Sequence, residues 1–208
     1  MVSGLQRSAW GYFKKFAVAD RAAIVVSAAF ADPASFDRSQ LIFATVMYSF
    51  QLYADFSGYT DIVLGMGEIL GLHLPENFRQ PFFSASVKEL WAWWHISLSQ
   101  WFRDYVYIPL GGNRVSVLRW CFNMFVVWLL SGLWHGAGWN FLFWGLWFAF
   151  FLILEKLFLG DILESVPKVF GRIYTLAVVL ISWVFFALES PGEILAYLQA
   201  MFGMNGIG

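Results

Sequence analysis

A run of 35 consecutive uncharged residues, between Arg119 and Glu155, constrains the fold of this chain more than any other feature. As a single α-helix the run would extend about 50 Å, whereas the hydrocarbon core of a membrane is about 30 Å thick. The run must therefore bend, tilt strongly or cross twice. Because glycines gather around Gly136 at its middle, we predict one helix over residues 117–134 and another over 139–156.

The overall composition supports a membrane protein. Of the 208 residues, 60% are hydrophobic and only 13% are charged, against about 25% charged residues in a typical soluble domain. This composition excludes intrinsic disorder, and the net charge of −1 argues against a nucleic-acid partner. The single cysteine, Cys121, excludes an intramolecular disulfide and a multi-cysteine zinc site. We therefore predict an all-α, polytopic membrane protein.

Three other apolar segments are less regular. Residues 173–188 carry no charge and are long enough for a third span if their flanking residues snorkel. One helix over residues 41–72 would be too long for a membrane, so we predict a break at Ser57 and Gly58. Residues 22–31 are too short to span and are expected to be re-entrant or interfacial.

The long connection over residues 73–114 is punctuated by proline and glycine. Within it, we predict one short helix over residues 86–102, whose tryptophans favour the membrane interface. Near the N-terminus, Arg7, Lys14, Lys15 and Arg21 alternate with aromatic residues, which is typical of a membrane-surface helix.

The positive charges predict an orientation. Residues 73–119 and 155–172 carry several lysines and arginines, whereas the turn at 134–140 and the tail at 189–208 carry none. By the positive-inside rule, the first two segments are expected in the cytoplasm and the other two outside.

His135 is the strongest candidate for chemistry because it lies at the centre of the uncharged stretch, in the sequence LWHGAGWNF. An ionisable group at membrane depth is costly and marks a functional site by default. Imidazole can accept and return a proton near neutral pH. A structural histidine that bonds between helices, or one that is merely exposed on an external turn, explains the position equally well at this stage.

The other two histidines carry less weight. His95 lies within the tryptophan-rich helix, where an amphipathic interfacial role is the simpler interpretation. His73 follows a predicted helix end, where the helix dipole favours a C-terminal cap.

Four further charged residues stand out. Asp55 and Asp61 do not share a face of a continuous helix, but across a break in the helix they would converge on one cavity. The alternative, which is slightly favoured, is that their side chains bond backbone groups freed by the break. Arg103 and Asp104 predict an interfacial ion pair or a local tether. No phosphate loop, nucleophile elbow or zinc spacing is present in the sequence.

Five stretches of the sequence resemble the membrane-bound O-acyltransferases, and in particular the branch of integral-membrane subunits that acetylate alginate. They are GYFKKFAVAD, FADPASF, LYADFSGYTDIVLGMGEILGLHLPENFRQPF, WWHISLSQWFRDYVYIPLGGNR and SGLWHGAGWNFLFWG. They occur in the family's order and cover most of residues 11–160. The resemblance implies a partial acyltransferase fold forming one membrane domain over residues 1–208, with 73–114 as its cytoplasmic or interfacial segment.

The resemblance also implies roles for individual residues. His135 falls on the family's catalytic histidine and His95 on its second histidine, and the two line a tunnel through the membrane. The implied candidates for lining this tunnel are Asp55, Ser57, Tyr59, Asp61, Trp94, Arg103, Asp104, Trp134 and Asn140. No metal and no bound cofactor are expected.

The implied reaction moves an acetyl group from a cytoplasmic thioester, acetyl-CoA, to a hydroxyl group of an exported polysaccharide in alginate-type biosynthesis. The implied setting is the bacterial inner membrane, crossed several times, with membrane lipid and periplasmic acetyltransferases as partners. The acceptor is either the glycan itself or a carrier residue on a partner.

Two departures from the family matter. Before Trp94 and His95, this chain has Ala92 and Trp93 where relatives usually carry two arginines, which removes positive charge near the expected donor entrance. The chain is also much shorter than intact relatives, so we expect a fragment that carries the catalytic core.

Three alternatives stay open from the sequence. The chain is a non-catalytic scaffold for a periplasmic acetyltransferase, a transferase of D-alanine or another acyl group, or, as a minor alternative, a transporter.

Overall fold

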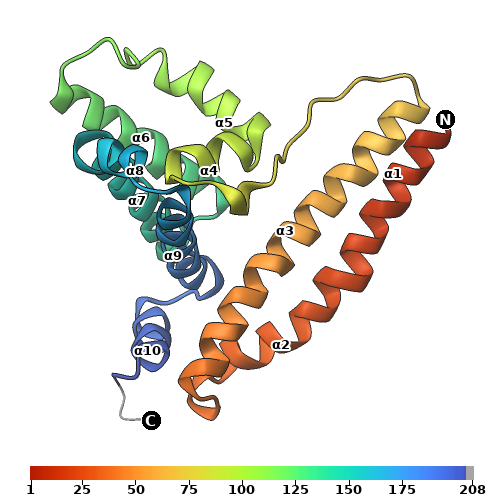
Figure 1. Cartoon of the computed structure of the whole chain (residues 1–208), viewed down its shortest axis with the longest axis horizontal. Helices are drawn as coiled ribbons and strands as arrows, with labels where there is room; N and C mark the ends of the chain where they lie inside the picture. Colours follow the sequence, from red (N-terminus) through yellow and green to blue (C-terminus); the bar gives the residue numbers. More distant parts are fainter. Residues whose placement is uncertain (205–208) are drawn as a thin grey trace. The chain divides into compact units, whose positions relative to one another are not determined.

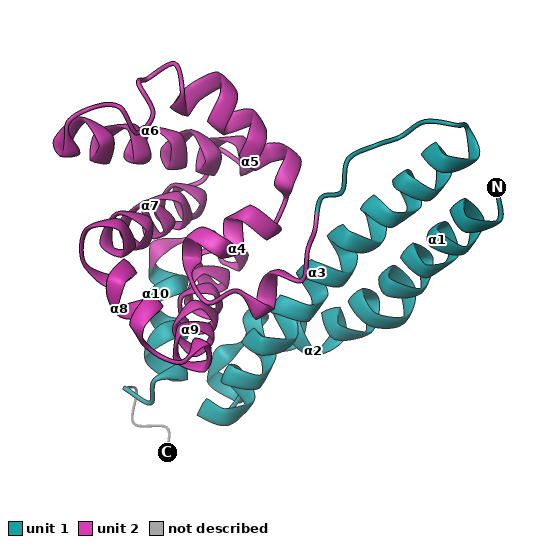
Figure 2. Ribbon diagram, turned by 45° about the horizontal axis from the view of Figure 1, so that its top comes forward, with its two compact units in different colours: residues 1–77, 192–208 teal, residues 78–191 magenta. Residues whose placement is uncertain are grey.

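The computed structural model describes residues 1–204 and confirms the all-α class predicted for the chain. Residues 205–208, the end of the predicted external tail, lie outside the described residues. The chain forms two compact units (Figures 1 and 2). Unit 1 comprises residues 1–77 and 192–208, and unit 2 comprises residues 78–191.

Unit 1 is built around two long helical stretches. The first runs through α1 (Val2–Phe13), a π-helical turn (Lys14–Ala19) and α2 (Asp20–Ala31). The second is α3 (Arg38–Ile69), which begins with a capping box between Asp37 and Gln40. α10 (Pro191–Met201) adds Tyr197, whose ring lies 4.4 Å from that of Phe30.

α1 and α3 run antiparallel and lie side by side (Figure 1). Their contact depends on two glycine pairs, Gly4 with Gly65 and Gly11 with Gly58. A Cβ atom at Gly11 would lie 2.5 Å from the carbonyl oxygen of Gly58, so a larger residue would push the helices apart. The seven-residue spacing on both helices keeps the glycines on the contact face.

One sequence-based prediction about unit 1 is wrong. The expected break at Ser57 and Gly58 does not exist, because both residues lie inside α3. Gly58 serves the close approach of α1 and not a helix break. Residues 22–31 complete the helical stretch that begins at Val2, and their interfacial or re-entrant position stays a prediction.

Unit 2 contains a series of short and long helices (Figure 2). In chain order they are a 3₁₀ turn (Pro81–Phe83), α4 (Val87–Trp93), α5 (Ile96–Phe102), a π-helical turn (Arg103–Tyr107), α6 (Val117–His135), α7 (Trp139–Leu154), a π-helical turn (Glu155–Leu159), α8 (Gly160–Ser165) and α9 (Lys168–Ala187). The predicted helices over 117–134 and 139–156 are confirmed, including the break between them. The single helix predicted over 86–102 is wrong, because the backbone breaks at His95.

Three stretches within residues 1–204 are long and apolar enough to cross a membrane. They are Val117–His135, Trp139–Ser165 and Lys168–Ala187, and all three belong to unit 2. Between them lies an aromatic core that includes the buried rings of Trp128, Trp144 and Phe148. Edge-on and tilted ring pairs of this kind contribute about 0.5–1.5 kcal/mol each beyond the burial of their area.

Candidate active site

The candidate active site of unit 2 lies where α6 ends and α7 begins. α6 ends at His135, and the two helices that flank this point meet at Gly132 and Gly145. A Cβ atom at Gly132 would overlap the carbonyl oxygen of Phe141, and one at Gly145 would overlap that of Trp128. The absence of a side chain at both positions therefore lets the helices approach closely and holds His135 against α7.

Aromatic rings surround the imidazole of His135. The distances between its ring centroid and theirs are 4.7 Å to Trp144, 4.9 Å to Trp134, 5.4 Å to Phe186 and 6.3 Å to Phe141. Phe186 comes from α9, so three helices contribute to this setting. The aromatic surroundings restrict the rotation of the ring and keep water from most of its surface.

One hydrogen bond determines which nitrogen of His135 carries the proton. Nδ1 lies 2.7 Å from the carbonyl oxygen of Ser131, one turn earlier on α6. A carbonyl oxygen can only accept a hydrogen bond, so Nδ1 is the donor. In the neutral ring, Nε2 then keeps its lone pair and can accept a proton from a substrate.

His95 is the second histidine of this region, at the junction of α4 and α5. Its backbone is left-handed, with φ of 45°, which separates the two helices. Its ring lies 5.8 Å from that of Trp134, which also contacts His135. Burial, together with the positive charge that His135 acquires on protonation, lowers the pKa of His95 to about 4. His95 is therefore neutral at physiological pH.

Three other predicted residues also belong to unit 2. Trp134 lies between the two histidines and remains 57% exposed. Trp94 is buried and packs against Phe82 and Trp183, so its contacts are those of a core residue. Asn140 is buried in the first turn of α7.

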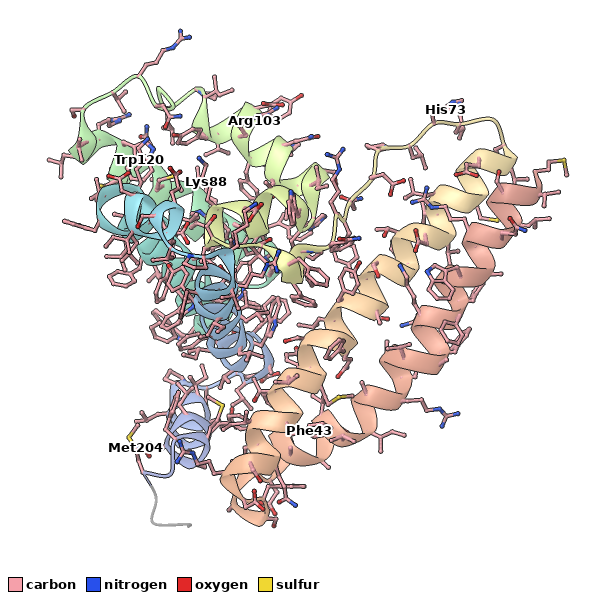
Figure 3. All side chains as sticks on the ribbon, viewed as in Figure 1. Phe43, His73, Lys88, Arg103, Trp120 and Met204 are labelled. Carbon is pink, nitrogen blue, oxygen red and sulfur yellow. The ribbon has the colours of Figure 1, made fainter. Side chains whose placement is uncertain are left out.

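Arg103 and Asp104 form a local ion pair. Arg103, labelled in Figure 3, places its Nε 2.7 Å from Asp104 Oδ1. Both side chains are exposed on the turn that follows α5. The hydrogen bond from Arg103 lowers the pKa of Asp104. The pair matches the predicted local tether, and its contacts are made within the turn itself.

The remaining predicted tunnel residues, Asp55, Ser57, Tyr59 and Asp61, lie on α3 in unit 1. Because α3 is unbroken, the two acidic residues do not converge across a break. Tyr59 is 60% exposed. His73 lies on the connection after α3 (Figure 3). The C-terminal end of α3 is capped by hydrogen bonds from the backbone amides of Gly71 and Leu72.

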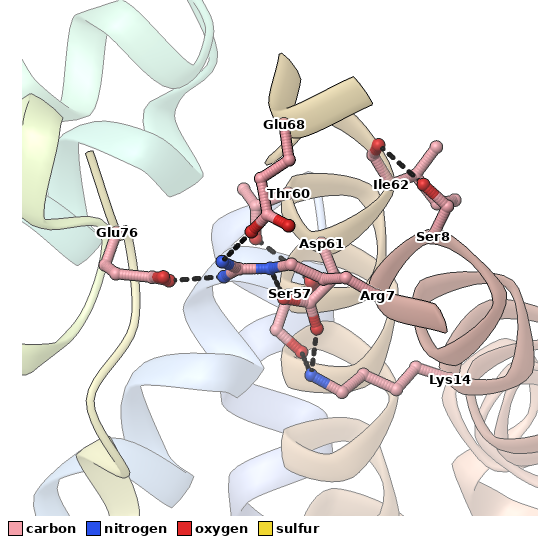
Figure 4. A network of polar contacts seen from close by, with 9 residues as sticks. All are labelled: Arg7, Ser8, Lys14, Ser57, Thr60, Asp61, Ile62, Glu68 and Glu76. Atoms are coloured by element: carbon pink, nitrogen blue, oxygen red, sulfur yellow. Dashed lines mark hydrogen bonds and ion pairs between the residues drawn. The ribbon is translucent and has the colours of Figure 1, made fainter. Parts of the chain in front are cut away.

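The acidic residues of α3 are paired with basic residues of the first helical stretch (Figure 4). Asp61 accepts hydrogen bonds from Lys14 Nζ at 2.6 Å and from Arg7 Nε at 3.1 Å. Arg7 and Lys14 are seven residues apart and so point from one face of that stretch towards the same carboxylate. Arg7 also bonds Glu76 at 2.6 Å, and this bond, with the contribution of Asp61, raises its pKa.

A second pair joins Lys15 to Asp55, and Ser57 Oγ lies 3.3 Å from Lys14 Nζ. The hydrogen bond to Asp55 raises the pKa of Lys15. These lysines neutralise acidic residues of α3, and the membrane-surface position that the sequence suggested for their helix stays a prediction. Their contacts identify a structural network in unit 1.

Sequence reasoning missed Glu155, whose side chain is only 5% exposed. Its position at the end of the long uncharged run was the available signal, because a carboxylate there must have partners. Among residues 1–204, no group of three or more histidine, cysteine, aspartate or glutamate side chains is arranged to hold a metal ion.

Comparison with known proteins shows the family of the chain. Residues 10–191 match the membrane-bound O-acyltransferase family. A peptidoglycan O-acetyltransferase of Helicobacter pylori is 37% identical over 200 residues, which are 95% of this chain and 38% of that protein.

Two probable alginate O-acetylases are similar to the chain over nearly its whole length. That of Azotobacter vinelandii is 38% identical over 204 residues, covering 97% of this chain and 40% of the relative. That of Pseudomonas putida is 40% identical over 207 residues, which are 97% of this chain and 41% of the relative. The chain thus spans about two fifths of the length of these curated relatives.

Proposed function

The chain belongs to the membrane-bound O-acyltransferase family, and from that premise we propose that the protein transfers an acetyl group from a thioester to a hydroxyl group of an exported polysaccharide. The observation that carries the proposal is the bond between His135 Nδ1 and the Ser131 carbonyl. It leaves Nε2 as the proton acceptor, which is the requirement for a general base.

The reaction proceeds in two proton transfers at His135. The hydroxyl proton of the acceptor passes to Nε2 while the hydroxyl oxygen attacks the carbonyl carbon of the thioester. The carbon–sulfur bond then breaks, and the thiolate takes the proton from His135. The products are an acetyl ester and a free thiol, and the histidine returns to its starting state.

His95 has a different part in this scheme. Because its pKa is lowered to about 4, it stays neutral at physiological pH and does not repel the protonated His135. A neutral imidazole can donate one hydrogen bond, so His95 orients the thioester carbonyl.

Acetyl-CoA is the donor in this proposal, and it reaches the site from the cytoplasm. The support is the excess of lysine and arginine in residues 73–119 and 155–172, which the positive-inside rule assigns to that side. The three spanning stretches support a multi-pass position in the bacterial inner membrane.

The acceptor is a secreted polysaccharide of the alginate type, with periplasmic acetyltransferases as partners. Relatives named as alginate O-acetylases support this choice. The relative named as a peptidoglycan O-acetyltransferase makes peptidoglycan the second candidate, because both names describe acetyl esters on a glycan.

The test compares the gene at its own locus with a His135→Ala version. Ester-bound acetate and ester-bound D-alanine are released by mild alkali and measured separately in the exported polysaccharide, peptidoglycan and teichoic acid fractions. Membrane levels of both proteins are compared by immunoblot. His73→Ala is the matched control, since it removes an imidazole from the connection after α3.

Loss of acetate from the exported polysaccharide, at an equal protein level, is the expected result. Loss of acetate from peptidoglycan alone would identify peptidoglycan as the acceptor. Loss of ester-bound D-alanine would identify D-alanine as the transferred acyl group. Unchanged acetate in His135→Ala would contradict catalysis and favour a scaffold for a periplasmic acetyltransferase.

A further inference from the structure

Glu155 places a buried carboxylate in unit 2, in the π-helical turn that follows α7. Its two oxygens accept hydrogen bonds from consecutive backbone amides. Oε1 lies 2.6 Å from the amide nitrogen of Val87, and Oε2 lies 3.0 Å from that of Lys88. A buried carboxylate is costly unless such bonds compensate it, and a π-helical turn inside a longer helix is frequent at functional sites.

The two amides are the first of α4, where backbone N–H groups have no partner within the helix. The rest of this helix start is also satisfied. The amide of Glu89 donates to Ser86 Oγ at 3.0 Å, and the carboxylate of Glu89 accepts from the amide of Ala85 at 2.6 Å. The positive end of the helix dipole adds to the attraction for the Glu155 carboxylate. Glu155 therefore binds the first two amides of α4, next to the Ser86 cap.

α4 leads directly to the candidate active site. It has seven residues and a length of about 10 Å, and it ends immediately before Trp94 and His95. The ring of His95 contacts Trp134, a neighbour of His135. Because α4 is so short, a change in its direction at Val87 also displaces its C-terminal end, next to His95.

α4 also reaches His135 by a second route. The ring of Trp91, on α4, lies 5.5 Å from that of Trp144 and 4.7 Å from that of Trp128. Trp144 in turn lies 4.7 Å from His135. One helix thus supports the surroundings of His135 from two directions.

We propose that Glu155 is a positioning residue for acyl transfer: it holds the start of α4, and α4 holds His95 and Trp91 in place around His135. This inference rests on the proposed function. Glu155 does not touch the reacting atoms; it acts through the helix that it caps.

Other contacts hold the residues before α4, so removal of the carboxylate shifts the helix without releasing it. Arg172 Nε donates to the carbonyl oxygen of Phe83 at 3.1 Å. Gly171 on α9 allows the carbonyl of Ala85 to approach closely. A Glu155→Gln variant is therefore expected to fold. Its side chain keeps one acceptor oxygen but turns an NH₂ group towards one of the two amides.

The first experiment measures acetyl transfer in membranes that contain the complete protein with Glu155→Gln. We expect kcat to fall tenfold to a hundredfold, in the range of a misplaced catalytic group, at an unchanged KM for the acyl donor. Glu164→Gln is the matched control, because it makes the same change at an exposed site on α8. An unchanged kcat in Glu155→Gln would overturn the proposal.

The second experiment reports position without relying on activity. Cysteines introduced by His95→Cys and Trp134→Cys, in a Cys121→Ser background, are joined by a short bifunctional methanethiosulfonate cross-linker at a rate that depends on their separation. We expect Glu155→Gln to slow this reaction at least several-fold and Glu164→Gln to leave it unchanged. An unchanged rate would show that Glu155 does not position α4.

The two measurements also separate this inference from the proposed function. Retained acetate in His135→Ala would contradict catalysis by His135. The cross-linking rate would still measure whether Glu155 holds α4 in position, because it does not depend on activity. If Glu155→Gln does not reach its normal membrane level, Glu155→Asp takes its place. That variant keeps both oxygens on a shorter side chain and is expected to lower kcat and the cross-linking rate; wild-type values for both would overturn the proposal.

Discussion

Unit 1 and unit 2 place polar side chains among apolar helices in opposite ways. In unit 1, Asp61 is bonded to Arg7 and Lys14, so its charge is neutralised by fixed partners. In unit 2, the neighbours of His135 are aromatic rings and one backbone carbonyl. Neutralised charges hold two helices together, whereas an imidazole with an available Nε2 can exchange a proton with a substrate. The comparison separates structural polar residues from candidates for chemistry.

The two units share one feature, the close approach of helices at glycine. Gly132→Leu would drive a side chain into the backbone of α7, and Gly11→Leu would drive one into the backbone of α3. Both variants are expected to lose most of the folded protein, because backbone atoms cannot move aside. Gly192→Leu is the control, since nothing lies within 4 Å of a Cβ atom there. Detergent-solubilised yield and thermal unfolding measure the effect; a stable Gly132→Leu protein would contradict the close contact.

Breaking the charge network of unit 1 is expected to have a smaller effect. Asp61→Asn leaves Lys14 and part of Arg7 without their anionic partner, which costs about 1–3 kcal/mol of unfolding free energy. Turnover per folded molecule should stay unchanged, since the residue is structural. Asp104→Asn, which breaks the exposed pair with Arg103, should leave the melting temperature unaltered. Equal melting temperatures for the two variants would show that the Asp61 network contributes nothing to stability.

A dependence of stability on pH through His95 is also expected. Its pKa is about 4 in the folded protein, below the ordinary value of 6.5, so the unfolded chain binds more protons between these values. Stability should therefore be fully present above pH 6.5 and decrease as the pH falls towards 4. Melting temperatures of the wild type and His95→Gln, compared at pH 7 and pH 5, measure it. A wild type that loses no more stability than His95→Gln on acidification would contradict the burial of His95.

Sequence reasoning predicted best where one segment determined the outcome by itself. The uncharged run with Gly136 at its centre was enough to predict α6, α7 and the placement of His135 between them. It failed where a distant partner decided the outcome. The length of residues 41–72 suggested a broken helix across which Asp55 and Asp61 would converge, whereas their actual partners, two lysines and an arginine, lie 40 or more residues away in the sequence.

Two features of the site had no usable signal in a single sequence. The left-handed backbone of His95 is rare for a residue other than glycine, so the helix over 86–102 was predicted as unbroken. The approach of Phe186 to His135 depends on how α9 packs, which residue spacing does not reveal. Glu155 was visible as the end of the uncharged run, but its bonds to α4 appear only in the fold.

The most direct test of the difference between the units is acetyl transfer per folded molecule in His135→Ala and Asp61→Asn, measured in the same membranes. Folded protein is quantified for each variant by its thermal unfolding signal. We predict that His135→Ala keeps its folded protein and loses turnover about a hundredfold or more, whereas Asp61→Asn loses stability and keeps its turnover. Full turnover in His135→Ala, or a stable Asp61→Asn protein without turnover, would contradict the assignment of chemistry to unit 2 and structure to the charges of unit 1.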